Sequence, residues 1–105
     1  MFTGDESHQI PLGEAAEFTA RFRSSHSKDD GIGLFYSKKF LTSVLQEPEC
    51  VGIRVYFGEN ADGEPQPVIV GVDKDGNDLT EGIIGELGLP CPPYCSEDNP
   101  LNTSE

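Results

Sequence analysis

The sequence predicts an α+β fold in which two helices pack on a small antiparallel sheet built around a β-hairpin, with an extended proline-rich strip near the C-terminal end. Three observations lead to this prediction. Apolar residues recur at helical spacing in the first part of the chain, they alternate along its middle, and prolines gather near its end. Helices also precede strands along the chain, which argues against alternating βαβ winding.

Helical signals occur in two segments. Residues 11–24 are predicted to form the first helix, because Pro11 suits a first helical position and apolar residues follow at helical spacing. The apolar run at residues 32–36 is either a strand or a tight approach to the next helix. Ser37 is predicted to be the N-cap of a second helix over residues 38–46. The apolar face of this helix comprises Phe40, Leu41, Val44 and Leu45.

The middle of the chain changes to the period of a β-hairpin. Residues 50–57 are β-branched and aromatic, and residues 68–73 form a second apolar run. Residues 60–63, Asn-Ala-Asp-Gly, supply the turn between them. Because two strands alone are marginally stable, the segment at Ile83 and Ile84 is expected to add a third strand or a covering loop. The alternating apolar residues of the first strand are Val51, Ile53, Val55 and Phe57.

The chain of 105 residues has the length of one domain. We expect a flexible N-terminus over residues 1–9 and a single α+β domain over residues 10–95. Residues 96–105 have the composition of a disordered acidic tail.

Acidic residues dominate the second half of the chain, and the formal net charge is −12 at pH 7. Residues 1–57 carry six Lys/Arg against eight Asp/Glu, whereas residues 58–105 carry only Lys74 against eleven Asp/Glu. Such a surface repels phosphate groups, so we expect neither nucleic acid nor an anionic membrane as a partner. It favours solubility and fits a basic partner or a cation.

The sequence predicts a cytoplasmic location. The segment from Met1 to Glu6 lacks the basic and apolar regions of a signal peptide, and no apolar run is long enough to span a bilayer. Three cysteines are an odd number and too few for a disulfide scaffold. We therefore expect reduced thiols.

Four segments resemble a group of small, uncharacterised bacterial proteins. They are Cys50–Tyr56 (CVGIRVY), Val68–Asp73 (VIVGVD), Asp75–Asp78 (DGND) and Leu89–Cys95 (LPCPPYC). The resemblance extends over roughly residues 10–96 and implies a compact bacterial domain. It implies no catalytic or binding residue.

The strip Leu89–Cys95 holds two of the three cysteines and is the first candidate site. Cys91 and Cys95 are spaced by three residues, whereas thioredoxin-type motifs space their cysteines by two. In extended geometry about 12 Å would separate their Cα atoms, so a disulfide needs a turn at Pro93 and Tyr94 or a cis proline.

A zinc site is the metal alternative at these cysteines. Cys91, Cys95 and Cys50 could supply three ligands, with His8 or His26 as the fourth. The remaining interpretation is a stiff strip that covers the core. No cofactor is predicted, and zinc is kept as the exception.

The leading hypothesis for function is a small non-enzymatic domain that acts by protein–protein contact or self-association. Motifs of nucleophilic, metalloprotease or phosphate-binding sites do not occur in the sequence. Arg54, Tyr56 and Tyr94 are candidate contact residues, and the edge of the hairpin is a second candidate surface. Arg54 is also expected to pair with a carboxylate on the neighbouring strand.

Two alternative functions are kept. One is a zinc- or thiol-dependent protein centred on Cys91 and Cys95. The other is a small-ligand binder that uses the space between the helices and the sheet.

Overall fold

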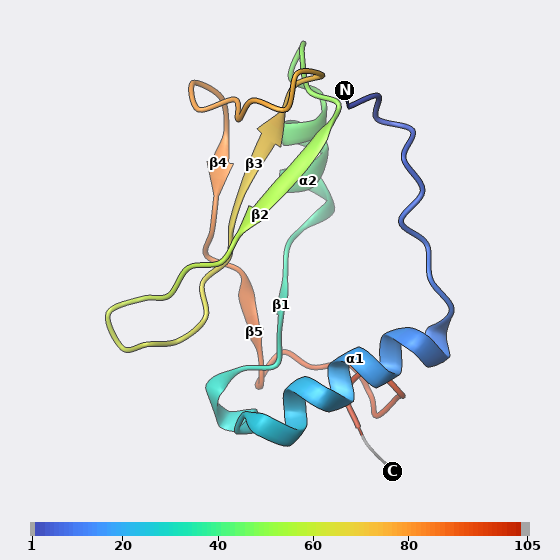
Figure 1. The fold of residues 1–105 in the computed structure, drawn as a ribbon. Coiled ribbons are helices and arrows are strands. Elements are labelled where there is room, and N and C mark those ends of the chain that lie inside the picture. The colour runs from blue at the N-terminus through green and yellow to red at the C-terminus, as the bar shows by residue number, and fades with distance from the viewer. Residues whose placement is uncertain (1, 104–105) are drawn as a thin grey trace. The chain divides into compact units, whose positions relative to one another are not determined.

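A computed structural model describes residues 2–103 and contains two helices and two small antiparallel sheets (Figure 1). The predicted α+β class is confirmed. The chain divides into two compact units. We call residues 2–7 and 36–88 the core unit, and residues 8–35 and 89–103 the disulfide unit.

The core unit contains one helix and a three-stranded antiparallel sheet. The sheet has the order β2-β3-β4, so β3 is central. The predicted hairpin is confirmed by β2 and β3, which pair from Gly52↔Val72 to Tyr56↔Val68. The segment at Ile84 forms the third strand, β4, rather than a covering loop. The bounds are α2 (Lys38–Leu45), β2 (Gly52–Tyr56), β3 (Val68–Val72) and β4 (Ile84–Gly85).

Helix α2 begins where the sequence predicts it. The Ser37 hydroxyl oxygen accepts a hydrogen bond of 3.0 Å from the Phe40 backbone N–H, which caps the first turn. The Phe40 ring lies against β4 so closely that a Cβ atom at Gly85 would overlap it. Glycine at this position therefore lets the helix approach the sheet.

The hydrophobic core is centred on β3. Four side chains are buried, with exposed fractions of 0% for Val44 of α2, and 4%, 3% and 2% for Ile69, Val70 and Val72 of β3. The alternating row on β2 is more open, because β2 is an edge strand and has a neighbouring strand on one side only. The core unit is therefore held by its central strand and by one helix.

The disulfide unit contains a helix and a two-stranded sheet. Its elements are α1 (Leu12–Ser25), the 3₁₀ turn η1 (Lys28–Asp30), β1 (Gly33–Phe35) and β5 (Leu89–Cys91). The run at residues 32–36 thus forms a strand, which pairs with the start of the proline-rich strip through Gly33↔Cys91, Leu34↔Pro90 and Phe35↔Leu89. In Figure 1, β1 and β5 lie side by side.

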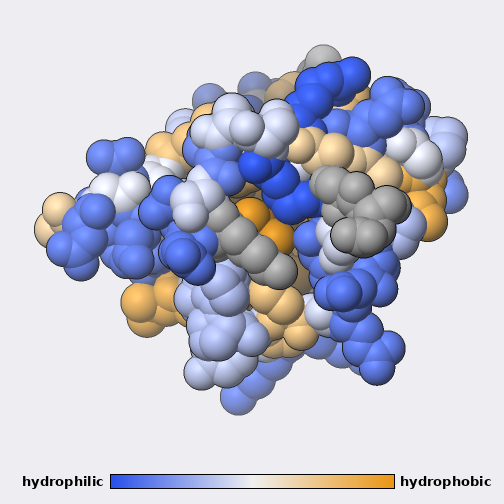
Figure 2. Space-filling model, turned by 90° about the horizontal axis from the view of Figure 1, so that it is seen from below, coloured by the Kyte–Doolittle hydropathy of each residue, from blue (hydrophilic) through white to orange (hydrophobic). Residues whose placement is uncertain are grey.

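Among the side chains described in the disulfide unit, none is as buried as the three valines and one isoleucine of the core. Leu12 and Phe18 of α1 are more than half exposed, at 56% and 54%. Figure 2 shows one face of the molecule, on which apolar residues lie at the surface among hydrophilic ones. Apolar burial alone therefore does not hold this unit together.

Both chain ends make hydrogen bonds within their own units, and the flexibility expected for residues 1–9 and 96–105 stays a prediction. The Phe2 backbone N–H donates to the Lys74 carbonyl at 2.9 Å, and the Phe2 ring lies against Gly76. Residues 96–103 form turns in which the side-chain oxygens of Asn99 and Asn102 accept hydrogen bonds from backbone N–H groups. Residues 104 and 105 of the predicted acidic tail lie outside the described residues.

Candidate functional site

Strand β2 has one edge that no other strand of residues 2–103 covers. Beyond the strand, the backbone N–H of Gln66 donates to the Gly58 carbonyl at 2.8 Å, and the backbone N–H of Asn60 donates to the Glu64 carbonyl at 3.0 Å. Bonded and non-bonded pairs alternate along an antiparallel ladder, and the register is continuous with β2. Alternate residues therefore direct their N–H and C=O groups away from β3; these residues are Ile53, Val55 and Phe57.

We call Ile53, Val55 and Phe57 the open edge. Their side chains are exposed by 41%, 45% and 98%, so the residues with unpaired backbone groups also carry apolar surface. Phe57 is almost fully in water, and complete burial of such a side chain is favourable by about 2 kcal/mol. Unpaired backbone groups combined with apolar side chains are the features that another strand recognises.

The open edge is bordered by carboxylates. The hairpin loop after Phe57 carries Glu59, Asp62 and Glu64, all exposed, and no basic residue. Asn60 stabilises the conformation of this loop: its side-chain oxygen Oδ1 accepts from the backbone N–H groups of Asp62 and Glu64 at 2.9 and 3.0 Å. The loop that carries these carboxylates therefore has a defined backbone conformation and follows the open edge directly along the chain.

Arg54 and Tyr56 lie on the opposite face of β2 and share one carboxylate. Arg54 Nη1 donates to Asp78 Oδ1 at 2.5 Å and to the Gly76 carbonyl at 3.1 Å, and the Tyr56 hydroxyl donates to Asp78 Oδ2. The Phe2 ring lies 6.0 Å from the guanidinium carbon. The expected pairing of Arg54 with a carboxylate is confirmed, but Asp78 lies in the segment between β3 and β4 and not on the neighbouring strand β3.

This cluster changes the titration of its members. The Tyr56 hydrogen bond, together with Arg54, lowers the pKa of Asp78 below its usual range. The hydrogen bond to Asp78, followed by burial, raises the pKa of Tyr56. The polar groups of Arg54 and Tyr56 thus have partners within the core unit, and their role in contacts with another protein stays a prediction.

The cysteine site is closed by a bond. Cys91 and Cys95 form a disulfide with their Cα atoms 4.8 Å apart, and the Cys91–Pro92 and Pro92–Pro93 peptide bonds are cis. The Tyr94 N–H donates to the Pro90 carbonyl at 2.9 Å, which closes the turn between the two sulfurs. The extended geometry expected for this strip therefore does not hold beyond Cys91.

The disulfide affects the zinc prediction directly. Sulfurs in a disulfide are not thiolates, so Cys91 and Cys95 cannot bind zinc while the bond is intact. Cys50 is a free cysteine of the core unit, and its thiol donates to the Gly52 carbonyl at 3.0 Å. Within residues 2–103, no cluster of three or more His, Cys, Asp or Glu side chains is arranged to hold a metal ion.

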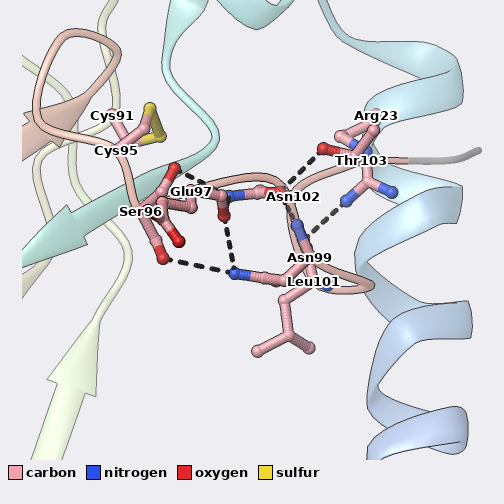
Figure 3. The surroundings of a disulfide bond; sticks show 9 residues. All are labelled: Arg23, Cys91, Cys95, Ser96, Glu97, Asn99, Leu101, Asn102 and Thr103. Atoms are coloured by element: carbon pink, nitrogen blue, oxygen red, sulfur yellow. Dashed lines mark hydrogen bonds between the residues drawn. A yellow bond between two sulfur atoms is a disulfide. The ribbon is translucent and has the colours of Figure 1, made fainter.

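The segment after the disulfide is attached to α1 (Figure 3). Arg23 Nη1 donates to the Leu101 carbonyl at 2.6 Å, and the figure shows the guanidinium pointing towards this turn. Asn99 and Asn102 both donate to the Glu97 carbonyl, at 3.0 and 3.1 Å. The sequence signal for this turn is the pair of asparagines, whose side chains bond readily to nearby backbone.

A shallow groove of about 540 Å³ lies between α1 and the turn. Its lining residues are Ala16, Glu17, Ala20, Arg23, Asp98, Asn99, Pro100 and Thr103. Tyr94, the third predicted contact residue, is 61% exposed and lies between the two bonded cysteines.

Comparisons of the chain with protein-family models, with curated proteins and with solved structures give no match. Neither helix of residues 2–103 combines the length and apolar content needed to cross a bilayer. The features of the described residues that bear on function are therefore the open edge and the disulfide.

Proposed function

We propose that the protein is a small non-enzymatic interaction domain that binds a protein partner through the open edge of β2. One observation carries the proposal: Ile53, Val55 and Phe57 combine unpaired backbone groups with exposed apolar side chains. A strand added to this edge would satisfy the backbone groups and cover Phe57 in one step. We assign no catalytic residue.

The energetics favour such an addition. Each new backbone hydrogen bond contributes about 1 kcal/mol net, and the apolar contacts add to it. Since β2 is already fixed by its pairing with β3, little backbone entropy is lost on this side of the interface.

A proline at Val55 tests the proposal. The backbone N–H of Val55 points away from β3. Val55→Pro therefore removes a hydrogen-bond donor at the open edge and leaves the hydrogen bonds between β2 and β3 intact. In affinity capture from the source cells, followed by cross-link mapping, we expect Val55→Pro and Phe57→Ser each to reduce partner recovery at least about tenfold. Thermal unfolding of both variants checks that the fold is intact.

Phe18→Ser is the matched control, because Phe18 is also an exposed phenylalanine but lies on α1 of the disulfide unit. We expect it to keep the partner. Equal recovery by the wild type, Val55→Pro and Phe57→Ser would refute an interaction at the open edge.

A second candidate function is a thiol-dependent role at Cys91 and Cys95, which the disulfide supports. In the proposed cytoplasmic location the glutathione pool keeps most thiols reduced, so the bond would respond to oxidants there. In an oxidising compartment it would be a permanent structural link. Thiol labelling of protein quenched inside the cell, with Cys50 as the internal free-thiol reference, separates these cases.

The same protein after reduction tests the zinc alternative. Elemental analysis would find about one zinc per chain if Cys91 and Cys95 bind the metal as thiolates. If the site exists, Cys91→Ser should lose that zinc. His8→Ala and His26→Ala are measured separately, and the variant that keeps the zinc identifies the histidine that is not a ligand.

A further inference from the structure

We infer that the partner of the open edge is an extended basic segment, with apolar residues at every second position, that joins the core-unit sheet as a strand beside β2. The inference rests on the proposed function and names the chemistry of its partner. It is supported by the carboxylates that follow the open edge, by the ion pair of Arg54 with Asp78 and by the alternation of side chains along β2.

Charge at the border selects a basic partner. Glu59, Asp62 and Glu64 follow the open edge along the chain, and Glu49 precedes it. The positive charge of Arg54 is neutralised by Asp78. A partner with Lys or Arg at the ends of its paired segment would meet carboxylates at both ends of β2, which speeds association and excludes acidic segments.

The alternation along β2 specifies what the partner presents between those charges. Side chains that share a face across neighbouring strands contact one another directly. Residues opposite Ile53, Val55 and Phe57 would therefore be apolar, and β-branched side chains fit best. Residues opposite Arg54 and Tyr56 would be polar, because that face carries the hydrogen bonds to Asp78.

A second copy of the chain is a poorer occupant at neutral pH. The core unit alone carries twelve Asp/Glu against four Lys/Arg. Two such surfaces repel each other when their open edges approach. The acidic border thus discriminates between a basic segment and the protein itself.

Two synthetic peptides test the inference on the full-length protein. Both have a core of alternating valine and threonine; one has two lysines at each end and the other has two glutamates. In NMR titrations of isotope-labelled protein, we expect the lysine peptide to slow amide exchange at Val55 and Phe57. It should bind at least about tenfold more tightly than the glutamate peptide, and this preference should shrink in about 1 M salt.

Two variants sharpen the assignment. Glu59→Gln with Glu64→Gln should reduce the preference for the lysine peptide without loss of edge protection, because only the border changes. Val55→Pro should abolish binding of both peptides, because the backbone donor is lost.

The outcomes separate the two proposals. Equal protection by both peptides, protection by neither, or pairing of β2 between copies of the protein would overturn the basic partner. If the lysine peptide binds elsewhere, leaves the Val55 and Phe57 amides unchanged and is unaffected by Val55→Pro, the open edge itself is not the interface and the proposed function fails with it.

Discussion

The core unit and the disulfide unit are stabilised in different ways. The core unit buries Val44, Ile69, Val70 and Val72 between a helix and a central strand. The disulfide unit has no side chain buried to that degree among those described, and it relies on one covalent bond and a set of hydrogen bonds. The difference shows how a short chain with few apolar residues can combine a small core with a covalent link.

The two units also offer surface differently. In the core unit, exposed apolar residues are ordered along one strand edge with unpaired backbone beside them. In the disulfide unit, the groove beside α1 is lined by alanines and by polar side chains of the turn after the disulfide. Only the first arrangement provides both backbone and side-chain features for strand recognition.

Truncation of the core is expected to have the largest effect. Val44→Ala removes two methyl groups from a fully buried site and leaves a cavity, so we expect about 2.5 kcal/mol less free energy of unfolding. Denaturant unfolding measures it. Val55→Ala is the matched control at 45% exposure, with an expected change below about 0.5 kcal/mol. Equal losses in both variants would contradict the position of the core.

Removal of the disulfide comes next. Because the bond closes a short loop, its loss in the Cys91→Ser and Cys95→Ser double variant should cost about 2 kcal/mol. Amide exchange should rise in residues 89–103 and stay low in β3. Cys50→Ser controls for the loss of a thiol and should leave residues 89–103 unchanged. Faster exchange in β3 alone would contradict a division of stability between the units.

Loss of the helix cap should have a smaller effect, confined to the core unit. Ser37→Ala removes the acceptor of the Phe40 N–H and should lower the free energy of unfolding by about 1 kcal/mol. Ser43→Ala, in the same helix, replaces a hydroxyl that donates to the Lys39 carbonyl and should be nearly neutral. A larger loss in Ser43→Ala than in Ser37→Ala would refute the cap.

The smallest change in the free energy of unfolding at neutral pH is expected for Asp78→Asn, which removes the carboxylate bonded to Arg54 and Tyr56. The size of this change depends on pH. The folded state lowers the pKa of Asp78, so the stability that its charge contributes is complete above the ordinary aspartate pKa of about 3.9. It is lost as the pH falls through the lowered folded value. Unfolding curves of the wild type and Asp78→Asn should therefore converge towards acid pH.

Asp62→Asn makes the same charge change in the exposed hairpin loop and should show no such convergence. Tyr56 is expected to affect stability at alkaline pH, because its pKa is raised in the folded state. Its contribution to the free energy of unfolding is complete below the ordinary tyrosine pKa of about 10 and is lost as the pH rises through the folded value. If the wild type and Tyr56→Phe lose stability identically as the pH rises, the hydrogen bond between Tyr56 and Asp78 would be contradicted.

Local signals allowed much of the fold to be predicted. Pro11 and the spacing after it locate α1 to within one residue, and Ser37 locates the start of α2. The alternation in β2 and the turn at residues 60–63 predict the hairpin and the edge used in the proposed interaction. Each of these signals lies within the segment that it describes.

The features that sequence could not supply depend on distant residues. The pairing of β1 with β5 joins residues 33–35 to residues 89–91, and no local pattern specifies that register. For the strip Leu89–Cys95 the sequence leaves both a disulfide and an extended backbone open, since residues that precede prolines favour extended backbone. Similarly, alternation alone could not reveal that β3 rather than β2 occupies the centre of the sheet.

The acidity of the hairpin loop has a practical consequence for handling the protein. An exposed edge strand with Val55 and Phe57 is a template for fibrillar aggregation. Near the isoelectric point, which the composition places at about pH 4.3, the chain loses the net negative charge to which this loop contributes, and colloidal repulsion falls. Purification and storage above pH 6, or the Val55→Pro variant, would keep the chain dispersed.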